Sequence, residues 1–302
     1  MAFRTSIMEL VLLLSFIAPS FAQNAQTKVT LHPIYRTVAP PGDAFPQDPN
    51  HISVVSVVLL TVSLIFVAAS FTESKRWNST VPAALTIGGA SCVFAEAINC
   101  YLSNVYWTTS HNPRLLMFTL MGRDFDVYVG IIWWSFGAAV GCCIYGALMR
   151  NVSTGTLWAC LGVAGMADLV LEEVILNYGG IYTYFGHQPL VLFGLFPCWW
   201  LFANVAGLFL GVAITYRYRN WFNGWKSVLL LPILPFCYVA PHTLAAMPTI
   251  YVIQADHSPL ITQMCGLLTA CLALVEVGII MDTVLERHPL KSNQAAPKGK
   301  SA

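Results

Sequence analysis

The stretch SVVSVVLLTVSLIFVAASFT (residues 53–72) decides the fold, because it is 20 residues long and contains no charged side chain. A helix of about 20 apolar residues spans the hydrocarbon layer of a bilayer. The pattern therefore predicts an all-α, polytopic membrane protein whose transmembrane domain covers residues 53–282. Six further apolar stretches follow the first, and we place these predicted helices at residues 80–102, 127–149, 154–177, 189–216, 226–248 and 258–282.

The composition agrees with a chain that faces lipid. Of its 302 residues, 57% are hydrophobic and 10% are charged, whereas soluble domains carry about 25% charged residues. The net charge of +1, without a basic patch interleaved with aromatic residues, argues against a nucleic-acid partner. The 9 cysteines all lie inside or at the ends of the apolar stretches. Such cysteines usually behave as small hydrophobic residues, so we expect no metal site there.

The two ends of the chain have different compositions. Residues 1–22 read as a signal peptide, in which Arg4 precedes an apolar stretch and residues 20–22 form a small-x-small cleavage site. An uncleaved anchor helix is the alternative. Residues 23–52 are polar and rich in proline, which predicts an irregular luminal segment. Residues 283–302 are polar and predict a disordered cytosolic tail.

The orientation follows from two independent features. A cleaved signal peptide leaves the new N-terminus in the lumen, so seven spans place the C-terminus in the cytosol. The cytosolic segments then carry ten lysines and arginines and the luminal segments carry four, namely Lys28, Arg36, Arg114 and Arg123. This difference agrees with the positive-inside rule. We expect a multi-pass protein of the endoplasmic reticulum membrane in a eukaryotic cell.

Five acids lie within the predicted spans, and they are Glu96, Asp168, Glu172, Glu173 and Glu276. An ionisable side chain inside a membrane is costly and indicates function. Asp168 and Glu172 are four residues apart and share one helix face, at a depth similar to that of Glu96. Repulsion and desolvation favour the neutral form, so at least one acid is expected to be protonated at neutral pH. Three interpretations stay open: hydrogen bonds that pin helices, an ion or proton pathway, and a catalytic or ligand pocket.

Aromatic and polar side chains occur at the same predicted depth. Tyr182 and Tyr184 lie in a short luminal connection after the acid-bearing helix, and Trp199 and Trp200 follow. Aromatic faces stabilise developing positive charge in a dry site, although an interfacial aromatic belt is the alternative. We predict that a substrate pocket is lined by Tyr182, Tyr184, Trp199, Trp200, Asn204 and His242.

A resemblance rests on the order of these motifs. The chain places an acidic stretch first, then glycine and tyrosine, then proline and tryptophan, as in Asp168-Leu169-Val170-Leu171-Glu172-Glu173, Tyr182-x-Tyr184, Pro197-x-Trp199-Trp200 and Asn204. This order resembles small polytopic proteins of actinobacteria and fungi and, distantly, the membrane hydratases of carotenoid biosynthesis. In size and acid content the chain is also similar to the seven-span cyclases of fungal meroterpenoid pathways. It differs from those cyclases in its signal peptide and in lacking their Trp-Glu element, since Ala95 precedes Glu96.

The resemblance implies a reaction type, because the meroterpenoid cyclases open an epoxide with one membrane acid and quench a cation with another. We expect an enzyme of secondary-metabolite biosynthesis that opens, hydrates or cyclises a lipophilic polyene, isoprenoid or epoxide. Asp168 or Glu172 is the expected proton donor, and Glu96 is the expected base. No cofactor is expected, because the sequence has neither a phosphate-binding glycine loop nor a paired-histidine metal motif. Other enzymes of the same pathway are possible partners, together with the bilayer.

Two other classes of function remain open. A seven-helix receptor fits the topology, although no lysine in the seventh span is available for a retinal Schiff base. A small proton-coupled transporter fits the acids, but transporters often repeat a broken helix in both halves. Pro232 and Pro235 have no such counterpart in an earlier span. A scaffold subunit would leave the acids unexplained.

Overall fold

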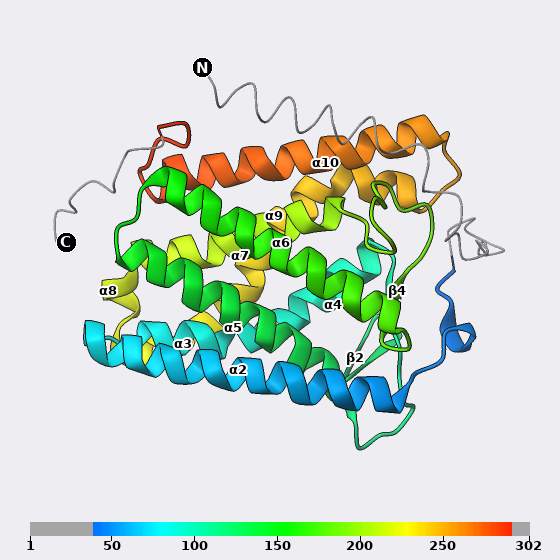
Figure 1. Cartoon of the computed structure of the whole chain (residues 1–302), viewed down its shortest axis with the longest axis horizontal. Helices are drawn as coiled ribbons and strands as arrows, with labels where there is room; N and C mark the ends of the chain where they lie inside the picture. The colour runs from blue at the N-terminus through cyan, green and yellow to red at the C-terminus, as the bar shows by residue number, and fades with distance from the viewer. Residues whose placement is uncertain (1–38, 292–302) are drawn as a thin grey trace.

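The computed structural model of the protein describes residues 39–291, and these residues form a mostly helical bundle with short strands at one end (Figure 1). The longer helices lie roughly side by side along the long axis of the molecule. The helices are α2 (Pro49–Trp77), α3 (Val81–Gly88), α4 (Cys92–Leu102), α5 (Val127–Met149), α6 (Thr154–Tyr178), α7 (Trp199–Arg217), α8 (Arg219–Phe222), α9 (Leu230–Ile253) and α10 (Pro259–Ile279).

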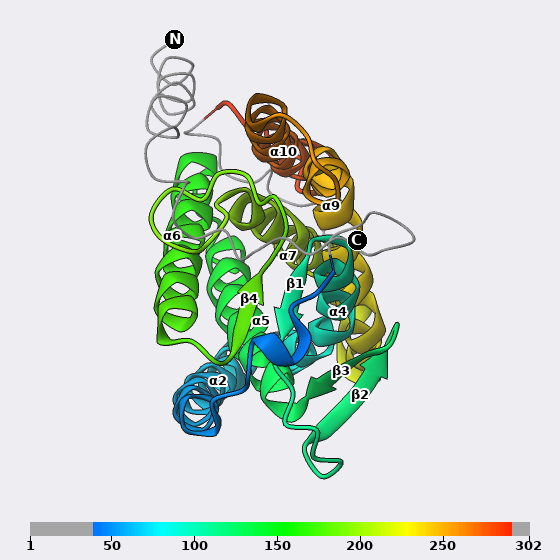
Figure 2. The same ribbon diagram turned by 90° about the vertical axis from the view of Figure 1, so that its right-hand side faces the viewer.

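Two small antiparallel sheets cover one end of the bundle, which we call the strand end (Figure 2). One sheet pairs β1 (Val105–Trp107) with β4 (Tyr182–Tyr184), and the other pairs β2 (Leu116–Leu120) with β3 (Arg123–Asp126). The opposite end, which we call the α8 end, carries the short helix α8. Within the bundle, α7 packs against α9 and α10, while α2 packs against α5.

Six helical segments of the described chain are long and apolar enough to cross a membrane. They are Pro49–Trp77, Val81–Leu102, Val127–Met149, Trp199–Arg217, Gly224–Ile253 and Pro259–Val284. The protein is therefore a multi-pass membrane protein by the length and composition of its helices.

Helix α6 is not one of these six segments, and three acids in its second half reduce its apolar character. It is nevertheless 25 residues long. At its start, Arg287 donates to the carbonyl of Val152, and just after its end the carbonyl of Gly180 accepts from the backbone N–H of Asp48. The helix therefore runs from the α8 end to the strand end. Its outward face is apolar, since Val163, Met166, Val170 and Val174 are each more than half exposed.

The first two predicted spans differ from the observed helices. Helix α2 begins at Pro49, so residues 49–52 are helical although we predicted an irregular segment there. The reason is local, because the Asp48 side chain accepts from two backbone N–H groups and proline is well tolerated in the first helical turn. The second span is interrupted by a 3₁₀ turn, η2 (Gly89–Ser91). At this turn Gly89 lies against Gly137 of α5 so closely that a Cβ atom on either would clash with the other's backbone.

The fifth predicted span was wrong at its start. We placed it at residues 189–216, but α7 begins only at Trp199, and the ten residues before it form an irregular connection. Pro189 and Pro197 have no backbone N–H to donate to a helix. As a result, Trp199 and Trp200 lie in the first turn of α7 and not near the middle of a span.

The remaining boundaries need smaller corrections. The sixth span starts with the 3₁₀ helix η3 (Gly224–Leu229) and continues through α9 despite its three internal prolines. The seventh ends in a π-helical turn, η4 (Ile280–Val284). Residues 283–291 of the predicted disordered tail are ordered, and Arg287 is buried there. The predicted signal peptide (1–22) lies outside the described residues.

Candidate functional site

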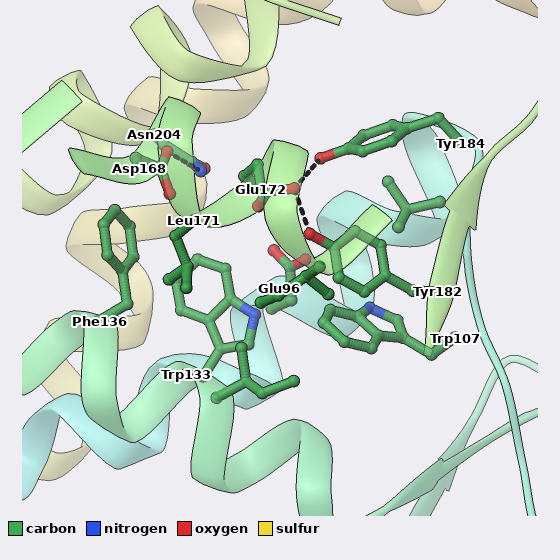
Figure 3. A pocket seen from close by; sticks show the side chains of 13 residues that line it. Glu96, Trp107, Trp133, Phe136, Asp168, Leu171, Glu172, Tyr182, Tyr184 and Asn204 are labelled. Atoms are coloured by element: carbon green, nitrogen blue, oxygen red, sulfur yellow. Dashed lines mark hydrogen bonds between the residues drawn. The ribbon is translucent and has the colours of Figure 1, made fainter. Parts of the chain in front are cut away.

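A small cavity of about 30 Å³ lies near the strand end, between α4, α5, α6, α7 and the β1–β4 sheet. Three of the acids predicted from the sequence line it together (Figure 3). Its polar lining consists of Glu96, Asp168, Glu172, Tyr182, Tyr184 and Asn204. Its apolar and indole lining consists of Val105, Trp107, Ile132, Trp133, Phe136, Leu171 and Ile175.

Two of these acids are joined by a chain of hydrogen-bond contacts across four helices. The Asn204 Nδ2 atom of α7 donates to Asp168 Oδ2 of α6 over 3.3 Å. The Tyr238 hydroxyl of α9 lies 2.7 Å from Asn204 Oδ1 and 3.2 Å from Glu96 Oε2 of α4. Gly207 of α7 permits this arrangement, because a Cβ atom there would come within 2.8 Å of the Tyr238 ring.

Glu172 has a different set of partners, which come from the β1–β4 sheet. The hydroxyl groups of Tyr182 and Tyr184 both donate to Glu172 Oε2, the second over 3.4 Å (Figure 3). Burial, and next the nearby Glu172 carboxyl group, hold the pKa of each tyrosine well above its usual range. The phenols therefore stay protonated and act as donors at physiological pH.

The sheet positions these tyrosines through its strand register. Tyr182 pairs with Trp107 of β1, and the two ring centroids are 4.3 Å apart. The Tyr128 hydroxyl of α5 lies 2.8 Å from the carbonyl oxygens of both Thr108 and Ile181. The connection after α6 is therefore fixed on both sides, which holds the phenols over the acids.

Three of the lining residues are partly exposed, and the others are buried. These three are Phe136 of α5 and Leu171 and Glu172 of α6. Phe136 and Leu171 lie at the same edge of the cavity in Figure 3. The cavity therefore approaches the surface along the seam between α5 and α6, beside the apolar side chains of Phe136 and Leu171 and the carboxyl group of Glu172.

Three residues predicted to line the pocket are placed elsewhere. Trp200 lies one layer behind the lining, with its ring 5.7 Å from that of Tyr184. His242 is fully buried, with its ring 4.6 Å from Trp200 and 5.5 Å from Tyr238. Trp199 donates from Nε1 to Gln188 Oε1 over 3.1 Å. These three side chains support the pocket from behind and do not line this cavity.

The other two membrane acids do not join the site. Glu173 accepts from the backbone N–H groups of Leu195 and Phe196 over 3.2 and 3.1 Å, and so it anchors the connection before α7. Glu276 is on α10, and one of its oxygens is buried with no hydrogen-bond partner in the described chain. Glu173 therefore has a structural role that its position beside Glu172 did not indicate.

The sequence analysis missed Tyr238, Trp107 and Cys100 as parts of the site. Cys100 donates from Sγ to Glu96 Oε1 over 2.9 Å and accepts from Trp107 Nε1 over 3.1 Å. One signal was available, because Cys100 lies one turn after Glu96, and Tyr238 lies one turn before His242. Trp107 carried no such signal, since its place depends on the pairing of β1 with β4.

The chemistry of the site follows from its partners. Within residues 39–291, Glu96, Asp168 and Glu172 form no ion pair with lysine or arginine. Their partners are phenol, amide and thiol groups. In this range, therefore, no paired lysine or arginine holds these carboxyl groups in the ionised form. No cluster of three or more potential metal ligands occurs in this range, and catalysis without a metal stays a prediction. Carboxyl groups in one buried cavity are suited to proton donation and acceptance.

The fold and the site together define a multi-pass α-helical membrane protein with an acid-lined cavity inside its helical bundle. No protein-family model, curated protein or solved structure matches the chain.

Proposed function

We propose that the cavity is the active site of an enzyme that opens, hydrates or cyclises a lipophilic epoxide, polyene or isoprenoid by acid–base catalysis. The observation that carries this proposal is the meeting of Glu96, Asp168 and Glu172 in one cavity without an arginine or lysine among its lining residues. A protonated acid and an ionised acid in one dry site provide the donor and the base for such a reaction.

The other lining residues favour a substrate of this class. Trp107, Trp133 and Tyr182 present aromatic rings to the cavity, and aromatic faces attract the positive charge of a carbocation-like intermediate. The apolar seam at Phe136 and Leu171 offers a route from the lipid phase. A substrate dissolved in the bilayer reaches the acids by this route without crossing water.

We also propose that α6 is a seventh span, so that the strand end is luminal and the α8 end is cytosolic. Its outward valines and its course between the two ends support this topology, and eight lysines and arginines of the described chain fall in segments assigned to the α8 end. The endoplasmic reticulum location rests on the signal-peptide prediction.

Glycosylation and protease protection test the number of spans. The substitutions Thr109→Asn and His111→Thr create a glycosylation sequon in the connection before β2, and a tag is added at the C-terminus. Five membrane spans separate the two sites if α6 crosses, so we expect glycosylation together with a tag that protease removes from intact microsomes. A glycosylated protein with a protected tag would contradict the crossing of α6.

The experiment that tests the enzymatic function is metabolite profiling of the source organism after deletion of this gene. We expect an epoxide, a polyene or a linear isoprenoid to accumulate, and its structure would identify the substrate class. An unchanged metabolome would contradict the enzyme and favour a proton-coupled transporter or a receptor.

A further inference from the structure

The direction of the hydrogen bonds around the cavity carries information about where the protons are. The contacts form one chain, in which Trp107 is followed by Cys100, Glu96, Tyr238, Asn204 and Asp168. Each hydroxyl or thiol in this chain has a single hydrogen, while the indole of tryptophan is a donor only. The chain therefore has few allowed arrangements.

The Asn204 end of the chain determines the hydrogen of Tyr238. Asn204 donates from Nδ2 to Asp168 Oδ2, so its Oδ1 atom faces the Tyr238 hydroxyl at 2.7 Å. Two oxygen atoms at this distance require a hydrogen between them. The amide oxygen has none, so Tyr238 donates its only hydrogen to Asn204.

The consequence falls on Glu96. Its Oε2 atom lies 3.2 Å from the same Tyr238 hydroxyl, whose hydrogen is already used. The Tyr238 hydrogen can be shared between the two oxygens, but the contact with Glu96 has a hydrogen of its own only if Glu96 is protonated and donates. The contacts at the Trp107 end agree with a protonated Glu96, because Trp107 donates to Cys100 and the thiol donates to the other carboxyl oxygen, Glu96 Oε1.

We propose that the Glu96–Asp168 pair holds one proton, that this proton is on Glu96, and that Asn204 and Tyr238 are positioning residues that fix this distribution. Glu96 is then the proton donor and Asp168 the base, which reverses the roles expected from the sequence. This assignment rests on the proposed function only for its catalytic meaning, since the proton count is a property of the resting protein.

The same chain also accommodates the state after one turnover. In the opening of an epoxide by water, the Glu96 proton moves to the epoxide oxygen as the C–O bond breaks. Water forms the new C–O bond and gives its proton to Asp168. If the Asn204 amide turns over, its Oδ1 accepts from protonated Asp168, its Nδ2 donates to Tyr238, and Tyr238 donates to ionised Glu96. Every group is again satisfied, and the pair still holds one proton.

The groups around the pair leave the assignment unchanged. From α4, Cys92 and Cys100 are thiols, from α9 Tyr238 is a phenol, and from α5 the Trp133 indole donates to Glu96. Glu172 of α6 accepts from two phenols, including Tyr182, and does not join this chain of contacts. Arg123 of β3 is the nearby cation, and it donates to the carbonyl oxygens of Val105 and Cys100 over 3.1 and 3.4 Å.

Infrared spectroscopy of the purified full-length protein in lipid tests this proposal, because a protonated carboxyl group has its own carbonyl-stretching band. The Glu276→Gln background removes the one other membrane glutamate with an unpartnered buried oxygen in the described chain. At neutral pH we expect such a band from Glu96, which shifts on isotopic labelling of glutamate and not of aspartate. Glu96→Gln should remove the band, since the amide N–H takes over the donation to Tyr238. Asp168→Asn should keep the band, since its carbonyl still accepts from Asn204, and Glu172→Gln should also keep it.

Several results would overturn the assignment. A band that shifts with labelled aspartate, or that Asp168→Asn removes, would place the proton on Asp168. No band would mean that both acids are ionised, and two bands that both persist in Glu172→Gln would mean that the pair holds two protons. The labelling result on the otherwise unmodified site separates a protonated glutamate from a protonated Asp168, and Glu172→Gln then separates Glu96 from Glu172. Because no turnover is measured, failure of the enzymatic proposal would leave this result intact.

Discussion

Two groups of acids at opposite ends of the bundle have opposite kinds of hydrogen-bond partner. At the α8 end, Glu73 lies 2.7 Å from an Arg150 nitrogen and 3.6 Å from an Arg76 nitrogen, and Glu286 pairs with Arg217. At the strand end, Glu96, Asp168 and Glu172 contact only neutral donors. An arginine stabilises a carboxylate and fixes its charge, whereas a phenol or amide leaves the proton available. The difference separates acids that hold the structure from acids suited to chemistry.

The largest expected effect is on turnover. We expect Glu96→Gln and Asp168→Asn each to lower kcat for conversion of the accumulated precursor by about 10²–10⁴-fold, which is the usual contribution of a general acid or base. Glu73→Gln is the matched control at the α8 end and should keep kcat near the wild-type value. The measurement is conversion by membranes that contain equal amounts of inserted protein. Equal losses in all three variants would remove the functional distinction between the two ends.

The phenols over Glu172 should give a smaller effect. Tyr182→Phe removes a hydrogen bond to a carboxylate, which is worth about 1.5–3 kcal/mol, so we expect about a 10-fold loss of kcat/KM or more. Tyr178→Phe is the control, because Tyr178 lies in the same part of the chain but is 45% exposed. Initial rates over a range of substrate concentrations measure both variants. A Tyr182→Phe enzyme with unchanged kcat/KM would exclude a role of this phenol in the reaction.

A several-fold effect is expected from narrowing the seam between α5 and α6. Phe136→Trp and Leu171→Trp enlarge side chains beside the opening, so we expect kcat/KM to fall. Val170→Trp enlarges the neighbouring residue on the outward face of α6, where 60% exposure leaves room for an indole. That control should behave like the wild type. If kcat/KM of the Val170→Trp control falls as much as kcat/KM of the seam variants, the substrate does not enter between these helices.

The smallest expected effect is on stability. The Arg150–Glu73 pair is partly exposed, and such pairs contribute about 0–1 kcal/mol to the free energy of unfolding. Glu73→Gln should therefore lower Tm slightly in detergent solution. Asp168→Asn should leave Tm unchanged or raise it, because it removes a carboxyl group from a dry cavity where desolvation is costly. A large fall of Tm in Asp168→Asn would instead assign this acid a structural role.

The sequence predicted the helical membrane fold better than it predicted the site. The equal depth of Glu96, Asp168 and Glu172 was compatible with one site, but depth alone could not show that the three acids meet in space. The predicted start of the fifth span was wrong because the connection before Trp199 is apolar, like a membrane helix, but contains Pro189 and Pro197. Trp107 of β1 pairs with Tyr182 of β4, which lies 75 residues later in the chain. The periodicity of one stretch of sequence cannot reveal such a pairing.

The measurement that tests the central claim most directly is complementation of the deletion strain, since it does not require the substrate to be identified first. The strain receives the wild-type gene, the Glu96→Gln and Asp168→Asn double variant, or Glu73→Gln, and membrane levels of each protein are matched. We predict that the wild type and Glu73→Gln restore the metabolite profile, while the double variant leaves the precursor accumulated. A double variant that restores the profile fully would contradict the assignment of acid–base chemistry to the strand end.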